Sequence, residues 1–446
     1  ALVSGSITTP TSGTSNLRIG VNAGDSIASG GNYNTVVGDE AGTAITTGDG
    51  NVALGYAALL VEDTGQYSTA IGYEALANQN NGAANYNVAV GTQAGRAVTT
   101  STNNTLIGGL AGDALTSGSL NTAVGYAALS GDTLGVYNVA VGVNALLTQN
   151  FTTSTFSYNT AVGTDAGKLV TTGTGQTLIG ALAGDAITTG ADNTAVGYQA
   201  LTTNQTSANN TAVGVSALKL NTGADNTAVG RGALLNQAAG TGNVAVGKDA
   251  GNDVTTGANN VLVGTAAGDA LTDADKNVAI GDQALSTDTL GSRSTAVGFG
   301  ALFTQNFTTA TDVYNVAVGT NAGLSVTTSQ SQTLVGGLAG DAITTGSENT
   351  ALGYKTLSAN TTGFYNVAVG SRALANMNVT DSSGTINTAV GYNAGNDVTT
   401  GTNNTFIGAY AGDALTDADF NTAVGVNALT ADTLGSRSTA VGWGAL

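Results

Sequence analysis

A five-residue motif recurs along the whole chain and limits what the chain can fold into. The motif reads Asn-Thr/Val-Ala-Val-Gly, with Ala three residues after the closing glycine and Leu or Gly one residue later. It occurs 25 times, and 18 of the 24 spacings between closing glycines are 17 residues. A short, fixed period is typical of a repeat protein whose units stack and contact only their neighbours. Such a stack presents repeated surfaces rather than one pocket built from unique residues.

Each repeat has the length of one coil of a β-solenoid. Seventeen residues are too few for a helix pair or a propeller blade. The chain is rich in Gly, Thr, Val and Asn, and it shows no sustained helical periodicity. We therefore expect an all-β fold, a parallel β-solenoid of about 25 coils over residues 16–446, preceded by a lead-in segment, residues 1–15. Residues 268–302 recur at 412–446, and only the first copy runs on, so we expect the sequence to be a fragment of a longer chain.

Positions within a coil are counted from the closing glycine, which is position zero. Positions minus one and minus three carry mostly Val, Ile and Thr, and because they share a face of an extended segment we expect them to fill the core. Position minus two is mostly Ala and would then face outward, against a second copy of the chain or, alternatively, against solvent. The residues expected at this contact between subunits are Leu106, Ala123, Ala140, Leu178, Ala195, Ala212, Leu262, Leu334 and Phe406.

Three further positions carry structural information. Position minus four is Asn in 20 coils, which predicts a ladder of amide hydrogen bonds along the stack. Position plus three is almost always Ala, which indicates a tight corner. Position plus four alternates in pairs, two coils with Gly and then two with Leu, so that four coils form a super-repeat of 72 residues, as between Gly264 and Gly336.

Composition excludes several kinds of partner and chemistry. The formal net charge of −18 argues against nucleic acid and anionic membranes as partners. The chain has no Cys and no His, so no nucleophile can be paired with a histidine base. It has no apolar run long enough for a transmembrane helix, and we expect no membrane insertion in this segment.

Two recurring motifs are weak candidates for chemistry. The motif Ala-Gly-Asp-Ala supplies one aspartate in each super-repeat, for example Asp113 and Asp185, too far apart in the stack to share a calcium ion. We expect a turn aspartate there and no metal site or cofactor. Paired threonines in the Gly-type coils, such as Thr46 and Thr47, would suit an ice-binding face, but the Leu-type coils interrupt the array. The carboxylates of this chain recur with the repeat, whereas a polysaccharide-degrading spike uses a unique pair, so that function is also disfavoured. We expect no catalytic residue and no enzyme.

The longest coils carry loops with aromatic residues. Four extra residues precede Gly163, Gly319 and Gly391. Insertions in repeat proteins often form the binding face. The expected contacts to a cell-surface glycan or protein receptor are Phe151, Phe156, Tyr158, Phe307 and Tyr314; the alternative is that these rings pack over a neighbouring coil.

The runs Asn-Thr-Ala-Val-Gly at 121–125 and Asn-Val-Ala-Val-Gly at 138–142 resemble the head repeats of trimeric autotransporter adhesins, the YadA-like heads. Similar repeats occur in bacteriophage tail-fibre shafts. The resemblance covers essentially residues 16–446, although 17 residues exceed the usual coil of that family, and we expect any neck, stalk or anchor to lie outside this segment. It implies a left-handed β-roll, a homotrimer of side-by-side or intertwined chains, and an extracellular adhesin or fibre shaft. A phage tail-fibre shaft is the alternative.

Overall fold

The computed structural model describes residues 12–380 and 384–446 of the chain. The chain divides into two units, Ala1–Thr222 and Gly223–Leu446, and each is a stack of coils with one three-residue strand per coil. Residues 1–11 of the predicted lead-in segment lie outside the described residues, as do residues 381–383 of the third long loop.

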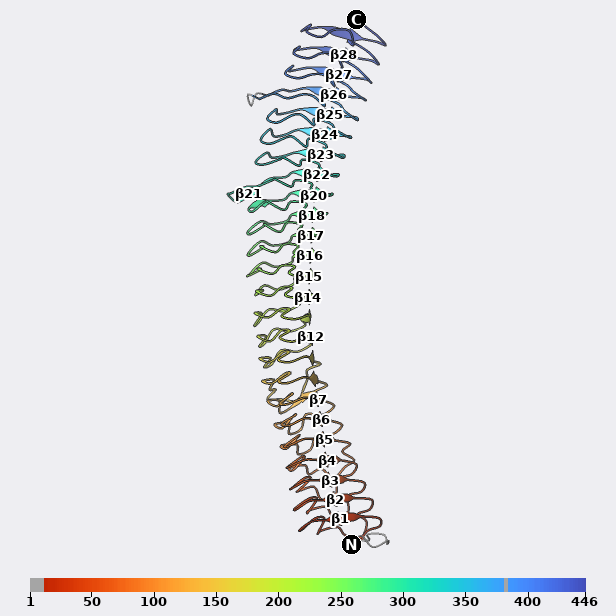
Figure 1. Ribbon diagram of the computed structural model, residues 1–446, viewed down its shortest axis with the longest axis vertical. Helices are drawn as coiled ribbons and strands as arrows, with labels where there is room; N and C mark the ends of the chain where they lie inside the picture. The colour runs from red at the N-terminus through yellow and green to blue at the C-terminus, as the bar shows by residue number, and fades with distance from the viewer. Residues whose placement is uncertain (1–11, 381–383) are drawn as a thin grey trace, which may run out of the picture. The chain divides into compact units, whose positions relative to one another are not determined.

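The first unit contains one ladder of strands and one short additional pair (Figure 1). The ladder strands are β1 (Leu17–Ile19), β2 (Thr35–Val37), β3 (Val52–Leu54), β4 (Thr69–Ile71), β5 (Val88–Val90), β6 (Thr105–Ile107), β7 (Thr122–Val124), β9 (Val139–Val141), β11 (Thr160–Val162), β12 (Thr177–Ile179), β13 (Thr194–Val196) and β14 (Thr211–Val213). The additional pair is β8 (Gly135–Val136) with β10 (Thr155–Phe156).

The second unit repeats this arrangement. Its ladder strands are β15 (Thr227–Val229), β16 (Val244–Val246), β17 (Val261–Val263), β18 (Val278–Ile280), β20 (Thr295–Val297), β22 (Val316–Val318), β23 (Thr333–Val335), β24 (Thr350–Leu352), β25 (Val367–Val369), β26 (Thr388–Val390), β27 (Thr405–Ile407), β28 (Thr422–Val424) and β29 (Thr439–Val441). The additional pair is β19 (Gly291–Ser292) with β21 (Thr311–Asp312), and β21 projects beyond the neighbouring coils in Figure 1.

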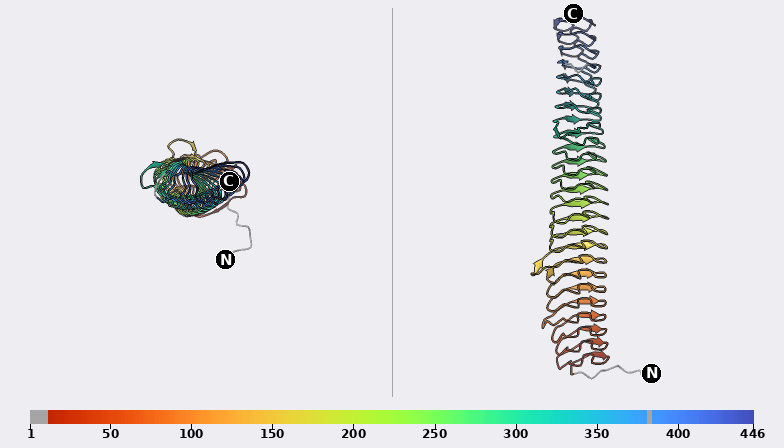
Figure 2. Two further views of the ribbon diagram at one scale, coloured as in Figure 1. Left: turned by 90° about the horizontal axis from the view of Figure 1, so that it is seen from above. Right: turned by 90° about the vertical axis from the view of Figure 1, so that its left-hand side faces the viewer.

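Within each ladder, every strand pairs with the next in parallel and in register. Thr35 pairs with Val52 in the first unit, for example, and Val244 pairs with Val261 in the second. The stacked arrows of each unit are visible from the side in Figure 2. The described residues contain no helix, and therefore none long and apolar enough to cross a membrane. The prediction of an all-β parallel β-solenoid of about 25 coils is confirmed.

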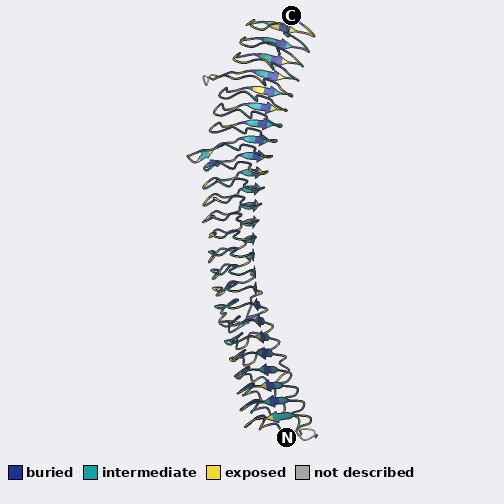
Figure 3. Ribbon diagram, viewed as in Figure 1, coloured by how far each residue is buried: buried dark blue, intermediate teal, exposed yellow. Residues whose placement is uncertain are grey.

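The faces of the strand are the reverse of those predicted from the sequence. Position minus two points into the coil, whereas positions minus one and minus three are partly exposed (Figure 3). Leu106 is 0% exposed, and the next residue along the strand, Ile107, is 39% exposed. The residues predicted to contact another subunit are therefore core residues, each completely buried within its own chain: Leu106, Ala123, Ala140, Leu178, Ala195, Ala212, Leu262, Leu334 and Phe406.

The narrow interior of the coil explains this reversal. The interior is already filled by buried side chains from the far side of the coil, such as Leu129 and Leu115, so a methyl group is all that fits at most minus-two positions. A larger residue fits only where glycine leaves space. A Cβ atom added to Gly95 would lie 2.6 Å from Leu106, and one added to Gly112 would lie 2.8 Å from it. Leu178, Leu262, Leu334 and Phe406 each lie in the same way between two glycines at plus four.

Positions plus four and plus seven exchange roles between the two kinds of coil. In Gly-type coils, plus seven is a buried aliphatic residue, such as Ile45 or Val98. In Leu-type coils the leucine fills this space, and plus seven is polar in every coil except that of Met377. These polar residues are Glu62, Gln79, Asp132, Gln149, Asn204, Asn221, Gln237, Asp288, Gln305, Asn360 and Asp432. Each coil except that of Met377 thus receives one large apolar side chain, from one of the two positions.

The backbone turns explain the residues at two positions, the closing glycine and position plus four. The closing glycine has a positive φ, for example 135° at Gly38, and a Cβ atom there would lie 2.5 Å from the carbonyl oxygen of Gly55 on the next coil. Position plus four is also left-handed, with φ of 53° at Gly42 and 53° at Leu59. Glycine adopts this conformation easily, whereas at plus four the buried side chain of leucine offsets the strain of a positive φ.

The asparagines at minus four form the predicted ladder, but the main partner is the backbone. The side-chain oxygen of Asn34 accepts a hydrogen bond from the backbone N–H of Asn51 on the next coil (2.9 Å). The amide of Asn34 donates to the carbonyl of Gly48 (2.8 Å). Amide-to-amide bonds also occur, as from Asn104 to Asn87 (3.3 Å). Each asparagine therefore satisfies backbone groups that would otherwise be buried without partners.

Candidate functional site

The long loop of the first unit begins with a buried phenylalanine. Phe151 was predicted to contact a receptor, but it is only 5% exposed, so this prediction is wrong. Its backbone N–H lies 3.4 Å from the carboxylate of Asp132, which also accepts a hydrogen bond from Gln149 at 2.7 Å. The ring is buried beside the coil of Asp132, which agrees with the alternative that aromatic residues of the loop pack over a neighbouring coil.

The rest of this loop forms an exposed aromatic cluster. Pairing of β10 with β8 places Phe156 beside Tyr137, with ring centroids 5.6 Å apart. Tyr137 stacks on Tyr158 at 5.3 Å. Phe156 and Tyr158 are 63% and 59% exposed. Tyr137 was not among the predicted residues, although its position, five residues before a closing glycine, carries a tyrosine in several coils. We name Tyr137, Phe156 and Tyr158 the aromatic cluster.

The corresponding loop of the second unit is built differently. Phe307 is buried, with its N–H bonded to the carboxylate of Asp288 (3.0 Å), so its prediction as a receptor contact is also wrong. Asp312 takes the place of Phe156 and forms an ion pair with Arg293 (2.8 Å). Tyr314 is exposed, with the Arg293 guanidinium 5.7 Å from its ring centre. This loop presents a charged surface with one tyrosine, and it has no counterpart of the aromatic cluster.

Exposed apolar side chains also follow the strands of both ladders. Position minus one presents Ile107, Ile179, Ile280 and Ile407, among others, all more than one-third exposed. Aromatic residues flank the strand at minus five and plus one, and some stack between coils, as Tyr56 does on Tyr73 at 5.2 Å. We name the minus-three and minus-one positions the outer strand face. Within the described chain, these residues are partly exposed, and most of the isoleucines and leucines at minus one are more than one-third exposed.

The recurring aspartates are half-buried turn residues, as predicted. One carboxylate oxygen of each of Asp113, Asp185, Asp269 and Asp341 is buried without a hydrogen-bond partner among the described residues. Burial raises the pKa of the Asp269 carboxyl to about 6, and the nearby Asp253 and Asp249 add to the shift. Burial likewise raises the pKa of Asp113, Asp185, Asp341 and Asp413. No described group of three acidic side chains is arranged to hold a metal ion.

A second set of carboxylates lies inside the Leu-type coils. Glu62 accepts hydrogen bonds from the N–H of Gly65 (2.8 Å) and from Gln79 (2.9 Å), and Asp132 is held in the same way. Burial raises the pKa of both carboxyls, and these hydrogen bonds oppose the shift. The hydrogen bonds of these acids lie inside the stack, within the coil and to the next coil, which makes them structural.

In the threonine array, the first hydroxyl of several pairs already forms a hydrogen bond within the fold. The hydroxyls of Thr46, Thr99, Thr171 and Thr255 each donate to a carbonyl of the next coil at 3.1 Å. A hydroxyl used in this way is no longer free to donate to an external lattice, which disfavours the ice-binding alternative.

These features define the class of the protein: it is a parallel β-solenoid repeat protein with apolar and aromatic surface rows. No protein-family model matches the chain, and no curated protein is significantly similar to it.

Proposed function

We propose that this segment is a non-enzymatic fibre shaft of an extracellular adhesin, whose chains associate side by side as a homotrimer. The observation that carries the proposal is the outer strand face, a row of Val, Ile and Leu side chains that its own chain leaves partly exposed. Extended apolar patches on soluble proteins usually mark interaction surfaces. A second copy of the chain fits the outer strand face best, because its own face repeats with the same spacing between coils.

The energetics favour summed contacts over one strong site. Burial of apolar surface contributes about 25 cal/mol per Å². One coil offers only a small area, but the same position recurs on each coil, so the contributions add along the ladder. The resemblance to YadA-like head repeats supports three chains and a left-handed roll. The alanines at position minus two do not form this contact between subunits, because they lie in the core of their own chain.

The aromatic cluster supplies a candidate receptor contact. Aromatic faces with neighbouring hydroxyls suit stacking on sugar rings. A homotrimer would present three copies, and weak contacts would then combine through effective concentration. A phage tail-fibre shaft is the alternative for the same fold, and the domains encoded on either side of this segment in the parent gene would separate the two.

Assembly is tested by placing charge on the outer strand face. Ile107→Glu combined with Ile179→Glu should dissociate the oligomer in sedimentation velocity, because each buries a carboxylate in the proposed contact. The matched control is Gln199→Glu with Gln283→Glu, on coils that are not adjacent, at position plus two, where Glu40 and Glu74 occur naturally. The unaltered chain sedimenting as a folded monomer at micromolar concentration would refute the proposal.

Recognition is tested separately on a glycan array. Replacing Tyr137, Phe156 and Tyr158 together with Ser should abolish glycan binding while the circular dichroism spectrum is retained. The control replaces the stacked pair Tyr56 and Tyr73 with Ser. If the cluster variant binds as the parent does, the loop is not the receptor site.

A further inference from the structure

Two cations stack on consecutive coils of the second unit. Lys355 and Arg372 both occupy position plus two, after β24 and β25. The backbone N–H of Arg372 donates a hydrogen bond to the backbone carbonyl of Tyr354 at 2.9 Å. Neighbouring coils in such a ladder are about 4.8 Å apart. Like charges on neighbouring coils repel each other, in a chain that has only 11 Lys and Arg residues; the Lys355 ammonium lies 5.6 Å from the ring centre of Tyr354.

Elsewhere the second unit neutralises such pairs. Arg231 and Lys248, also on consecutive coils, share the carboxylate of Asp249 at 3.0 and 3.8 Å. Arg293, stacked next to Lys276, forms an ion pair with Asp312. Among the described residues, neither Lys355 nor Arg372 forms an ion pair.

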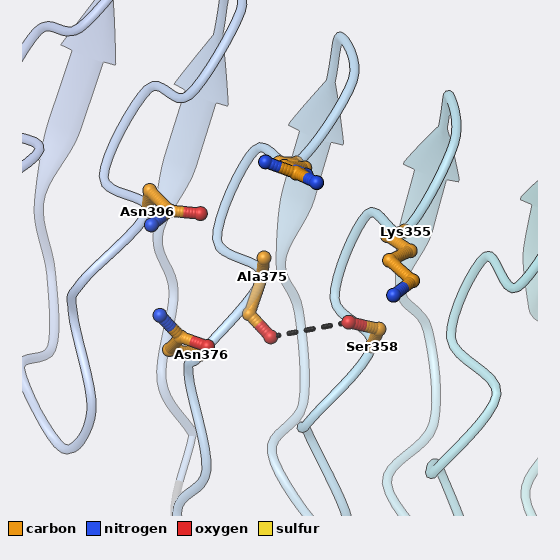
Figure 4. Close-up of a pocket in the computed structure, with 6 residues that line it drawn as sticks. Lys355, Ser358, Ala375, Asn376 and Asn396 are labelled. Carbon is orange, nitrogen blue, oxygen red and sulfur yellow. Dashed lines mark hydrogen bonds between the residues drawn. The ribbon is translucent and has the colours of Figure 1, made fainter.

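The unneutralised pair borders a polar pocket of about 300 Å³, which is at the lower end of the range for small-ligand sites. The pocket is lined by Lys355, Ser358, Arg372, Ala375, Asn376 and Asn396. Figure 4 shows Lys355 and Ser358 on one coil, Ala375 and Asn376 on the next, and Asn396 on the third. The hydroxyl of Ser358 donates to the carbonyl of Ala375 at 3.3 Å.

Acidic groups lie at the two ends of this pocket rather than between the cations. Asp397 accepts hydrogen bonds from the amides of Asn376 (3.2 Å) and Asn396 (2.7 Å), which orients both amides. Asp341 lies on the coil before Lys355, whose charge lowers the pKa of that carboxyl although burial raises it overall. The stretch between Lys355 and Arg372 is therefore the electropositive part of the pocket.

We propose that this pocket binds the oxyanion of an acidic saccharide, a carboxylate or sulfate group, between Lys355 and Arg372. A guanidinium can hold such a group through two parallel hydrogen bonds, and the ammonium adds a second charge. The anion would relieve the repulsion between the stacked cations. The Ser358 hydroxyl, whose proton is donated to Ala375, can still accept a hydrogen bond from a sugar hydroxyl, and each asparagine amide keeps a second N–H and its oxygen for the same purpose. This site is separate from the aromatic cluster and does not depend on assembly.

The test is calorimetric titration of the full chain with three probes: oligogalacturonate, a sulfated galactan oligosaccharide, and a neutral galactan oligosaccharide. We expect binding of at least one acidic probe, weakened by salt, and none of the neutral probe. Lys355→Gln with Arg372→Gln should weaken that binding by about tenfold or more, since hydrogen bonds to charged groups contribute about 1.5–3 kcal/mol. Glutamine is compatible with the left-handed backbone here, because Gln93, Gln199 and Gln283 occupy the same position with φ of 55–59°.

The matched control is Arg231→Gln with Lys248→Gln, which removes the same charge from the neutralised pair and should leave the affinity unchanged. Preference for the carboxylated or the sulfated probe identifies the oxyanion. Equal weakening by both double variants would show a general charge effect and overturn the proposal, as would absence of binding to both acidic probes. Since the aromatic cluster remains intact in these variants, the outcome does not bear on the loop.

Discussion

At position minus two, the side chain that fits is set by the residue at plus four. Leu106 occupies the space that Gly95 and Gly112 leave open, whereas Ala123 lies in a coil that contains Leu129. The sequence contains this relation, since after the first coil each large residue at minus two follows one plus-four glycine and precedes another. It is visible only when the two positions are compared with each other.

This relation gives a prediction at the scale of one residue. Leu106→Ala should lower the free energy of unfolding by about 3 kcal/mol, because it leaves a cavity in a closed interior. Ile107→Ala, on the opposite face of the same strand, should lower it by about 1 kcal/mol or less in a dilute, dissociated sample. Urea denaturation of the two variants measures both values. A larger effect at Ile107 would mean that the faces are assigned wrongly.

At the scale of the coil, the period predicted the architecture well but not the orientation of the strand. Constant spacing predicts one coil per repeat, and the asparagine ladder follows from identical neighbours, but the spacing suggested two short strands per coil where the structure has one ladder strand. Alternation divides the strand into two faces, but it does not say which face is interior. The preference of β-branched residues for packed sheets led to the wrong prediction that positions minus one and minus three fill the core. The interior facing the strand is too thin for these residues at most coils. The burial of Phe151 and Phe307 was not predicted, because nothing in the loop sequence marks the buried carboxylates that face their backbone N–H groups.

Buried acid–glutamine pairs make a second prediction. Asp132→Ala should destabilise the chain by about 2 kcal/mol, since the amide of Gln149 and the N–H of Gly135 lose their buried acceptor. Asp132→Asn keeps one acceptor and should lose less. Hydrogen exchange at the coils of β7, β9 and β11 reports the local effect. Equal protection in both variants and the parent would show that the pair contributes nothing.

Across the whole molecule, the recurring aspartates make stability depend on pH. Their folded-state pKa values are raised above about 3.9, the value in an unfolded chain, and that of Asp269 reaches about 6. Between these values the folded state holds more protons than the unfolded state, so the free energy of unfolding falls as the pH rises from about 4 to about 6. Above this window their contribution is constant.

The measurement is denaturant unfolding at pH 4, 5, 6 and 7. A variant with Asn at 113, 185, 269, 341 and 413 should show a shallower fall than the parent, and the difference between the two isolates these five carboxyls from the others. Identical slopes would contradict the assignment.

The pairing of glycines around each large minus-two residue also restricts how such a chain can change in length. Leu178 needs a plus-four glycine on either side, at Gly167 and Gly184, so these two coils can be gained or lost only together. A Leu-type coil has no such partner, and the one extra coil that interrupts the four-coil order, that of Leu234, is of this type. Duplication or engineering can therefore adjust the number of coils singly through Leu-type coils, whereas Gly-type coils are inherited in indivisible pairs.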